Sequence, residues 1–250
     1  MTIQFVSAFI DLNEDRSKGK SIDVYCKHFL KMASSNIQIY LFLSESYKEP
    51  YDRIVGPLEN VRIEIIELKD LDTYKNVSML ECKMPHVRTD YKDTKNYMIL
   101  MNSKIEFIHR VMEKTDYSHY SWIDCSLFHV IHDHVGGINY LKMLSAAHLS
   151  ESLYIPGCWD KSSIPTFHSI SWRFCGGFFI GGRKSLNDFY NEYNSLFTNV
   201  VTIHGLAWEV NIWAWLEHIG HLKCIWVKAD HNDSIIRLPA DAFVGSKDAT

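Results

Sequence analysis

The sequence predicts an α/β protein with a mostly parallel sheet flanked by helices, folded as a single domain. Two observations carry this prediction. Apolar residues make up 46% of the 250 positions, while Gly and Pro number only 12 and 6, as in a protein with a sizeable core. Strand-like and helix-like apolar patterns then alternate along the chain, which is how a parallel sheet with crossover helices is built.

The first elements follow from apolar periodicity. Residues 3–10 are almost continuously apolar, as expected of a strand buried on both faces. Ser21 stands where it can cap a helix over 22–33, whose apolar residues recur at helical spacing. Residues 37–43 and 61–66 predict two further strands, with a shorter helical link between them.

The rest of the chain continues this alternation, without an internal repeat or a linker. Residues 67–95 are polar and aperiodic, which predicts a long loop with one helical turn at most. The remaining expected elements are a strong helix with Tyr97, Met101, Ile105, Ile108 and Met112 along one face, a strand over 119–123, a helix over 137–149, an extended stretch over 153–155, a loop over 160–169, a strand over 171–180 that Gly176 and Gly177 interrupt, a helix over 183–197, a largely buried helix over 206–219 and a last strand over 222–227.

Charge and apolar run lengths exclude several classes of protein. The 26 Lys and Arg against 30 Asp and Glu give a net charge of −4, and no basic run is long enough to follow a phosphate backbone, so nucleic-acid binding is not expected. The run over 3–10 is too short for a signal peptide or a membrane span, and no transmembrane segment is expected. Six cysteines are spread singly, without zinc-site spacing, which favours reduced thiols in a cytosolic protein: Cys26, Cys82, Cys125, Cys158, Cys175 and Cys224.

Two acids follow predicted strands. In open parallel sheets, ligands bind beyond the carboxyl ends of the strands where the strand order reverses. Asp11 ends the first strand and Asp124 ends the strand over 119–123. An acid there can accept hydrogen bonds from a nucleotide or hold a divalent cation. A helix cap or a solvated loop acid is the alternative.

The residues around Asp124 suggest a weakened cation site. With Ser126 two positions on, the sequence has an Asp-x-Asp-like arrangement in which one carboxylate is replaced by a neutral oxygen. His231 and Asp233 are candidates for further ligands if the C-terminal stretch folds back, although such a spacing is mostly structural. A separate cluster of His129, His132, His134 and Asp133 favours a loop surface over a transition-metal site, because its spacing fits no helical ligand pair.

The run over 172–179 combines aromatic residues with two glycines. Gly176 and Gly177 would let the backbone approach a ligand closely, while the flanking rings offer a wall for a sugar. Arg173 is a candidate for pairing with phosphate. A β-bulge in a core strand is the alternative interpretation.

Two further charged residues stand among apolar ones. Glu209 lies near the start of the helix over 206–219, where it is a candidate general base or simply an acid that favours the helix dipole. Lys104 lies on the apolar face of its helix, where it is either a phosphate contact or a lysine whose ammonium reaches out to solvent.

Six short blocks spread over nearly the whole chain carry a resemblance: Phe5 to Asp11, Tyr97 to Lys104, Trp122 to Asp124, Trp172 to Gly177, Trp208 with Glu209, and His231 to Ser234. As a set and in this order, they resemble the HtrL/YibB family. These proteins are regarded as glycosyltransferases of GT-A type, linked to bacterial lipopolysaccharide or capsule glycans and also found in large viruses.

The resemblance implies a GT-A-like, Rossmann-related domain over 1–250, with a nucleotide-binding half over 1–127, a sugar and acceptor half over 128–238 and a flexible tail over 239–250. Phe9, Ile10 and Asp11 would then lie along the base and ribose of a nucleotide-diphosphate sugar of UDP or GDP type.

For the reaction, the resemblance implies that Asp124 binds a Mn²⁺ or Mg²⁺ ion at the diphosphate. Lys104 and Arg173 would assist at the leaving group, and Glu209 would activate an acceptor hydroxyl in an inverting enzyme. The same cation would use ligands drawn from Asp124, Ser126, His231 and Asp233, and Gly176, Gly177 and Glu209 would face the sugar and the acceptor.

The function implied is transfer of a sugar to a glycan or lipid-linked glycan in the cytoplasm, with peripheral attachment to a membrane left open. Two other functions remain in view. One is a nucleotide-sugar or glycan-binding module of the same fold without turnover, since Ser126 weakens the cation site. The other is a metal-dependent hydrolase built on the histidine cluster.

Overall fold

The protein is described here by a computed structural model that covers residues 2–12, 14, 21–90, 92–161 and 165–244. Seven strands form one sheet in the order β3-β2-β1-β4-β6-β5-β7. They are β1 (Ile3–Phe9), β2 (Ile39–Leu43), β3 (Val61–Ile65), β4 (His119–Ile123), β5 (Tyr154–Gly157), β6 (Phe178–Gly182) and β7 (Ile225–Lys228). Only β6 runs against its neighbours; the other neighbouring pairs in this sheet are parallel, so the predicted fold class is confirmed.

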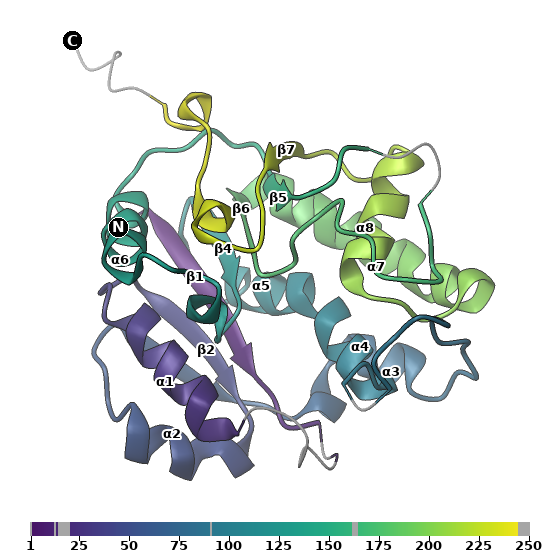
Figure 1. Cartoon of the computed structure of the whole chain (residues 1–250), viewed down its shortest axis with the longest axis horizontal. Coiled ribbons are helices and arrows are strands. Elements are labelled where there is room, and N and C mark those ends of the chain that lie inside the picture. Colours follow the sequence, from purple (N-terminus) through teal and green to yellow (C-terminus); the bar gives the residue numbers. More distant parts are fainter. Residues whose placement is uncertain (1, 13, 15–20, 91, 162–164, 245–250) are drawn as a thin grey trace.

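Helices cover both faces of the sheet (Figure 1). The α-helices are α1 (Ile22–Ala33), α2 (Lys48–Ile54), α3 (Asp72–Val77), α4 (Lys95–Asn102), α5 (Lys104–Met112), α6 (His134–Ser145), α7 (Arg183–His204) and α8 (Glu209–His218). Short 3-10 turns are η1 (Glu45–Tyr47), η2 (Leu68–Asp70), η3 (Leu127–His129), η4 (Asp233–Ile236) and η5 (Ala240–Ala242).

The core has two layers because successive strand residues point to opposite faces. Phe5 of β1 packs with residues of α1, α2 and α6, among them Phe29. Its neighbour Val6 packs on the other face, with residues of α5, α7 and α8 that include Phe107 and Trp213. This double cover explains why β1 and β2 are mostly apolar rather than alternating.

Several expected elements differ in extent. The segment 67–95 is not only a loop, because it contains η2 and α3. The expected long helix is interrupted at Ser103, whose hydroxyl donates to the Ile99 carbonyl at 2.8 Å, so that α5 begins at Lys104. Ser21 occupies the N-cap position of α1 as predicted, but its side chain makes no capping hydrogen bond.

The strand expected over 171–180 begins only at Phe178. The chain before it passes close to the end of β5: the Cys175 N–H donates to the Pro156 carbonyl at 2.7 Å, and an added Cβ on Gly157 would lie 1.8 Å from the Arg173 carbonyl oxygen. The helix expected over 183–197 extends to His204 and stops at Gly205, whose φ of +92° lies in a region that other residues rarely adopt.

The C-terminal stretch also differs from the expectation of a flexible tail from 239. Ala242 is fully buried and Phe243 pairs with Leu149 in an isolated antiparallel bridge, so residues 239–244 pack on the domain. Residues 245–250, and residues 162–164 of the loop expected over 160–169, lie outside the described residues.

Candidate functional site

The strand order has a switch point at the carboxyl ends of β1 and β4. The chain proceeds outward from β1 to β2 and β3, then returns to place β4 on the other side of β1. Such a switch point is where open α/β sheets bind ligands. Asp11 lies just beyond β1 and Asp124 directly after β4, where its backbone N–H donates to the Gly177 carbonyl at 2.9 Å. Both acids predicted from the sequence therefore lie at this edge.

Three charged side chains converge beside Asp124, and we call them the Lys104 cluster: Lys104, Asp124 and Glu209. The Lys104 Nζ donates to Glu209 Oε1 at 2.8 Å and to the Gly176 carbonyl at 2.8 Å, and it lies 3.2 Å from Asp124 Oδ1. Lys104 is 2% exposed, so its ammonium does not reach solvent. These residues come from the starts of α5 and α8 and the end of β4.

Burial and the neighbouring charges act in opposite directions on the pKa values of Lys104 and Glu209. Burial alone lowers the pKa of the Lys104 ammonium, but Asp124 and Glu209 outweigh it and hold that pKa above its usual value. Burial raises the pKa of the Glu209 carboxyl, and the attraction of Lys104 opposes this rise without cancelling it. Glu209 is thus a carboxylate that accepts a proton more readily than an exposed glutamate, as a general base requires.

Asp124 is the member of the cluster that reaches solvent. Its side chain is 32% exposed, and Trp122 Nε1 donates to Oδ1 at 2.6 Å. Trp122 and Lys104 therefore both hold the Oδ1 side of the carboxylate, which fixes its orientation. The other oxygen, Oδ2, lies 3.5 Å from where a Cβ on Gly177 would stand.

The absence of side chains at Gly176 and Gly177 leaves space for the charged groups of the cluster. A Cβ on Gly176 would lie 2.0 Å from Glu209 Oε1 and 3.1 Å from Lys104 Nζ. A side chain at position 176 would thus separate the buried ion pair. At Gly177 the nearest atom to an added Cβ is the end of the Leu127 side chain at 2.9 Å. The close backbone approach predicted for the glycines is therefore an approach to the protein's own charged groups.

The end of β1 forms the second part of this edge. Ser46 donates to Asp11 Oδ2 at 2.8 Å, and the Asp11 N–H donates to Ser44 Oγ at 3.0 Å. Ile10 is 1% exposed, so its side chain belongs to the core. Phe9 lies between Tyr25 and Tyr47, with ring centroids 5.4 and 4.7 Å away.

Arg173 is engaged elsewhere. Its guanidinium makes a two-pronged pair with Glu217 of α8, at 2.9 and 2.7 Å, and lies 4.5 Å from the centre of the Trp226 ring. This contact joins the segment before β6 to α8 and β7. A phosphate contact from Arg173 stays a prediction, and it would require the guanidinium to release Glu217. A phosphate contact from Lys104 also stays a prediction, and it would require displacement of one of the oxygens that now surround the ammonium.

The predicted cation ligands do not form a shell together. Asp233 Oδ1 accepts the backbone N–H groups of His132 and Asp133, at 3.0 and 2.9 Å. Ser126 precedes η3, and its carbonyl contacts His129 Nδ1 at 2.6 Å. His231 packs edge-on against Trp172, and burial lowers the pKa of its imidazole. In the described part of the chain, the close group of three ligand types is instead Cys158, Asp230 and His231.

The histidine cluster has local roles. Asp133 caps α6 by accepting the Gly136 N–H at 2.9 Å, and the His134 ring stacks on Phe128. Its side chains form no close metal group within the residues that the structure describes. Asp133 and His134 thus belong to the start of α6, and His129 lies in η3. A metal-dependent hydrolase built on these side chains stays a hypothesis.

Several residues at the site escaped the sequence analysis as functional candidates. Burial raises the pKa of the Tyr97 phenol, and the charges of Glu209 and Asp124 add to this rise, so the phenol lies within reach of their fields. Tyr25 and Tyr47, from α1 and η1, line the end of β1. An aromatic residue next to an element end was the only sequence signal, and it is too common to distinguish them.

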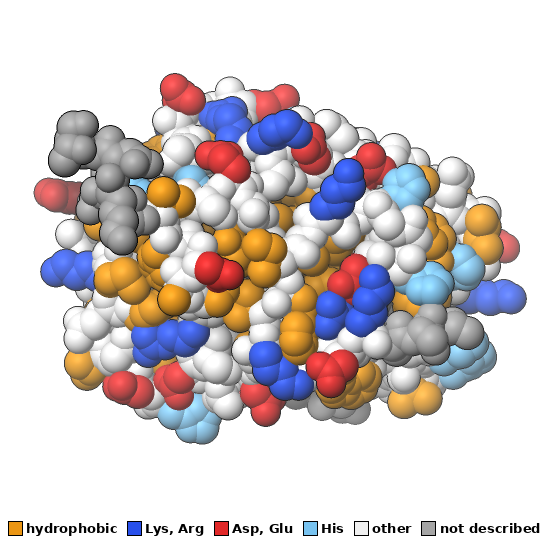
Figure 2. Space-filling view, turned by 90° about the horizontal axis from the view of Figure 1, so that it is seen from above, with side chains coloured by type: hydrophobic (Ala, Val, Ile, Leu, Met, Phe, Trp, Pro, Cys, Tyr) orange, Lys and Arg blue, Asp and Glu red, His pale blue; other side chains and the backbone are white. Residues whose placement is uncertain are grey.

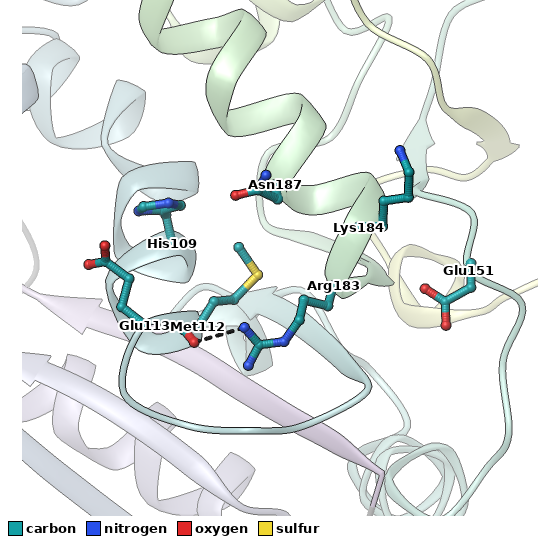
Figure 3. Close-up of a pocket in the computed structure, with 7 residues that line it drawn as sticks. All are labelled: His109, Met112, Glu113, Glu151, Arg183, Lys184 and Asn187. Atoms are coloured by element: carbon teal, nitrogen blue, oxygen red, sulfur yellow. Dashed lines mark hydrogen bonds between the residues drawn. The ribbon is translucent and has the colours of Figure 1, made fainter.

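A cavity of about 450 Å³ lies at the opposite end of the sheet, between the end of α5 and the start of α7 (Figure 3). His109, Glu113, Arg183 and Lys184 are among its lining residues. Arg183 donates to the Met112 carbonyl at 3.0 Å, as the dashed line shows. Since α7 follows directly on β6, which pairs with the amino end of β4, this cavity is separate from the edge that carries Asp124.

One face of the molecule carries charges of both signs. On the face shown in Figure 2, Lys and Arg side chains alternate with Asp and Glu, and apolar side chains show between them. None of the helices in the described part of the chain combines the length and apolar character that crossing a bilayer requires.

Comparisons with known proteins give only distant likenesses. No family model matches the chain, and no curated protein matches it. Among solved structures it is similar to mouse xyloside xylosyltransferase 1 in its apo form, with 7% identity over 91% of this chain and 84% of that one at a TM-score of 0.43. It is also similar to a glycosyltransferase involved in glycosylation of the major capsid of PBCV-1, with 11% identity, 92% and 82% coverage and a TM-score of 0.44.

A third likeness is to Rv0371C of Mycobacterium tuberculosis H37Rv in complex with manganese, with 10% identity, 95% and 93% coverage and a TM-score of 0.39. At these scores none of the three assigns an activity or a metal to this chain. What the chain does must be inferred from its own side chains at the edge of β1 and β4.

Proposed function

We propose that this protein is a glycosyltransferase that moves a sugar from a nucleotide-diphosphate donor, of UDP or GDP type, to a hydroxyl of a glycan or lipid-linked glycan. The observation that carries the proposal is the Lys104 cluster, which sets two carboxylates at the switch point of the sheet. The motif set shared with the HtrL/YibB proteins supports the same reading, and suggests a cytoplasmic enzyme of lipopolysaccharide, capsule or viral glycans.

The charge of the cluster suits the chemistry of glycosyl transfer. As the bond from the sugar to the diphosphate breaks, positive charge develops on the sugar in an oxocarbenium-like transition state. One ammonium and two carboxylates leave the cluster with an excess of negative charge, held in a largely buried place where it acts strongly. Asp124 is the exposed member and would face the donor.

Glu209 would act at the acceptor. In an inverting reaction its carboxylate takes the proton of the attacking hydroxyl, and its raised pKa suits this step. In a retaining reaction it would stabilise charge only. Lys104 then has a positioning role, because it holds Asp124 and Glu209 in fixed relation.

A Mn²⁺ or Mg²⁺ ion would have fewer protein ligands in this proposal than the sequence predicts. Among the described residues, Asp124, His231 and Asp233 do not form a close group of three ligand atoms, and Asp233 accepts two backbone N–H groups, so we propose fewer protein ligands than the four that the sequence predicts. The protein ligand left for such an ion is Asp124 Oδ2, with the remaining oxygens supplied by the diphosphate. No step above depends on it.

The test is release of nucleoside diphosphate across a panel of UDP- and GDP-sugars, with and without glycan acceptors. We expect release with at least one donor and a loss of about 10²-fold or more in Asp124→Asn, the scale of removing one electrostatic group from a transition state. Asp188→Asn is the matched control, since Asp188 pairs with Lys184 on the surface of α7.

Three results bear on the proposal in different ways. Full activity of Asp124→Asn would remove that residue from the reaction. Binding of a donor without release, in the presence of every acceptor tried, would favour the binding-module alternative. A wild-type protein that neither binds nor cleaves any donor would contradict both.

A further inference from the structure

A second group of reactive side chains lies outside the Lys104 cluster, beyond the carboxyl ends of the parallel neighbours β5 and β7. Cys158 directly follows β5, and Asp230 and His231 follow β7 after Ala229. Each offers one potential metal ligand, and these three atoms lie within 4.8 Å of one another. Residues 72 and 73 positions apart in sequence are thus brought together by adjacent strands.

The separations fit a small tetrahedral ion. Cys158 Sγ lies 3.7 Å from Asp230 Oδ1 and 4.0 Å from His231 Nδ1. At zinc, bond lengths of about 2.3 Å to sulfur and about 2.0–2.1 Å to nitrogen or oxygen give tetrahedral ligand pairs about 3.6 Å apart. The two distances from the Cys158 sulfur are therefore close to this value, and the ligand atoms of Asp230 and His231 lie within 4.8 Å of each other.

The three side chains are also held in place. The His231 ring packs edge-on against Trp172 at 4.2 Å, and the His231 N–H donates to Asp230 Oδ1 at 2.7 Å. The Cys158 N–H donates to the Trp172 carbonyl at 2.9 Å. Because these contacts already restrict the side chains, the ligand groups lose less conformational freedom when a metal binds.

A second thiol adjoins the group. Cys175 Sγ lies 3.4 Å from Cys158 Sγ, and Cys175 is fully buried. Because the Cys158 thiol points to Asp230, Cys175 is placed to donate its S–H to a Cys158 thiolate and so to support it as a ligand. Thiolate and imidazole select zinc over magnesium or manganese, which prefer all-oxygen sites.

We propose that Cys158, Asp230 and His231 bind one Zn²⁺ ion. Asp230 and His231 are exposed, so the fourth position faces solvent and takes a water molecule or a ligand. The ion ties the segment after β5 to the segment after β7. It lies next to Cys175, which directly precedes Gly176, the residue whose carbonyl accepts from Lys104. His231 is then a zinc ligand rather than a ligand of the cation at the diphosphate. The proposal does not rest on the transferase activity.

The test is titration of the metal-free chain with Co²⁺ and then Zn²⁺, in the presence of a non-thiol reductant that keeps all six cysteines reduced. We expect one ion per chain, thiolate-to-cobalt absorption that Zn²⁺ abolishes by displacement, and a rise in melting temperature with Zn²⁺. Cys158→Ser and His231→Gln should each weaken binding by at least 100-fold, and Cys175→Ser by about 10–100-fold as an outer partner.

The controls are Cys82→Ser, a half-buried cysteine elsewhere in the chain, and His218→Gln at the exposed end of α8. Both should bind like the wild type. Absence of thiolate absorption in the wild type, or unchanged affinity in Cys158→Ser, would overturn the proposal. Neither readout uses a nucleotide sugar, so failure here leaves the donor assay untouched, and failure of the donor assay leaves the metal titration untouched.

Discussion

Replacement of Lys104 by Met removes the ammonium that joins the two carboxylates and nearly preserves the length of the side chain. The Glu209 carboxylate, which is 6% exposed, then loses its ammonium partner at the start of α8. Removing one member of a buried ion pair costs about 3–5 kcal/mol, because the other charge is left without compensation. We expect a loss of this size at pH 7.5, which is roughly 6–20 °C in melting temperature for a protein of this length.

The same reasoning predicts how the loss changes with pH and with a second substitution. Glu209 already has a raised pKa, and without Lys104 that pKa rises further, so the carboxyl becomes neutral as the pH is lowered. The penalty of Lys104→Met should therefore shrink between pH 7.5 and pH 5. The double variant Lys104→Met with Glu209→Gln should recover part of the stability at pH 7.5, because no buried charge remains.

The assay is urea unfolding at the two pH values, followed by fluorescence of the tryptophans. Lys184→Met is the matched control: Lys184 is 81% exposed and pairs with Asp188 on the surface, so its loss should stay within about 0.5 kcal/mol. The reasoning is refuted if Lys104→Met costs no more than Lys184→Met, or if Glu209→Gln adds its own full cost in the double variant.

Three further predictions follow from the site. Gly176→Ala should abolish activity and destabilise the fold, because its methyl would lie 2.0 Å from Glu209 Oε1. Gly177→Ala should have a milder effect, because the nearest atom to its methyl is the end of the Leu127 side chain at 2.9 Å. Melting curves and donor cleavage of the two variants check this, and equal effects would contradict it. With Glu209 as general base, activity should fall as the pH drops through its raised pKa, since the protonated acid cannot accept a proton, and a rate profile flat down to pH 4 would exclude the role. Arg173→Met should lower stability by about 1–3 kcal/mol through loss of its pair with Glu217 and leave the donor KM unchanged, whereas a large rise in KM would restore Arg173 as a phosphate contact.

Much of the fold was predictable because strands that are buried on both faces appear in the sequence as apolar runs. The strands β1 and β2 are mostly apolar and almost completely buried, so their runs were found within one or two residues. The interruption at Ser103 was not predictable, because the apolar spacing continues across it from α4 into α5. The start of β6 was misplaced because the close approach of the Arg173 carbonyl to Gly157 is a tertiary contact that leaves no local pattern.

The site was predicted in its acids and missed in its connections. Asp11 and Asp124 were identifiable because each directly follows a strand, and strand ends meet at one edge. The partner of Lys104 stands 105 positions away, and no spacing rule relates two residues that meet only through packing of α5 and α8. His231 was a predicted metal ligand, but its proximity to Cys158 was missed for the same reason: a single cysteine carries no zinc signature until β5 and β7 lie side by side.

The most direct measurement of the central claim is a crystal structure with UDP or GDP bound. The account predicts the base and ribose beside Asp11 and the diphosphate beside Asp124, at the carboxyl ends of β1 and β4. A nucleotide held instead in the cavity between α5 and α7, against Arg183 and Lys184, would contradict it.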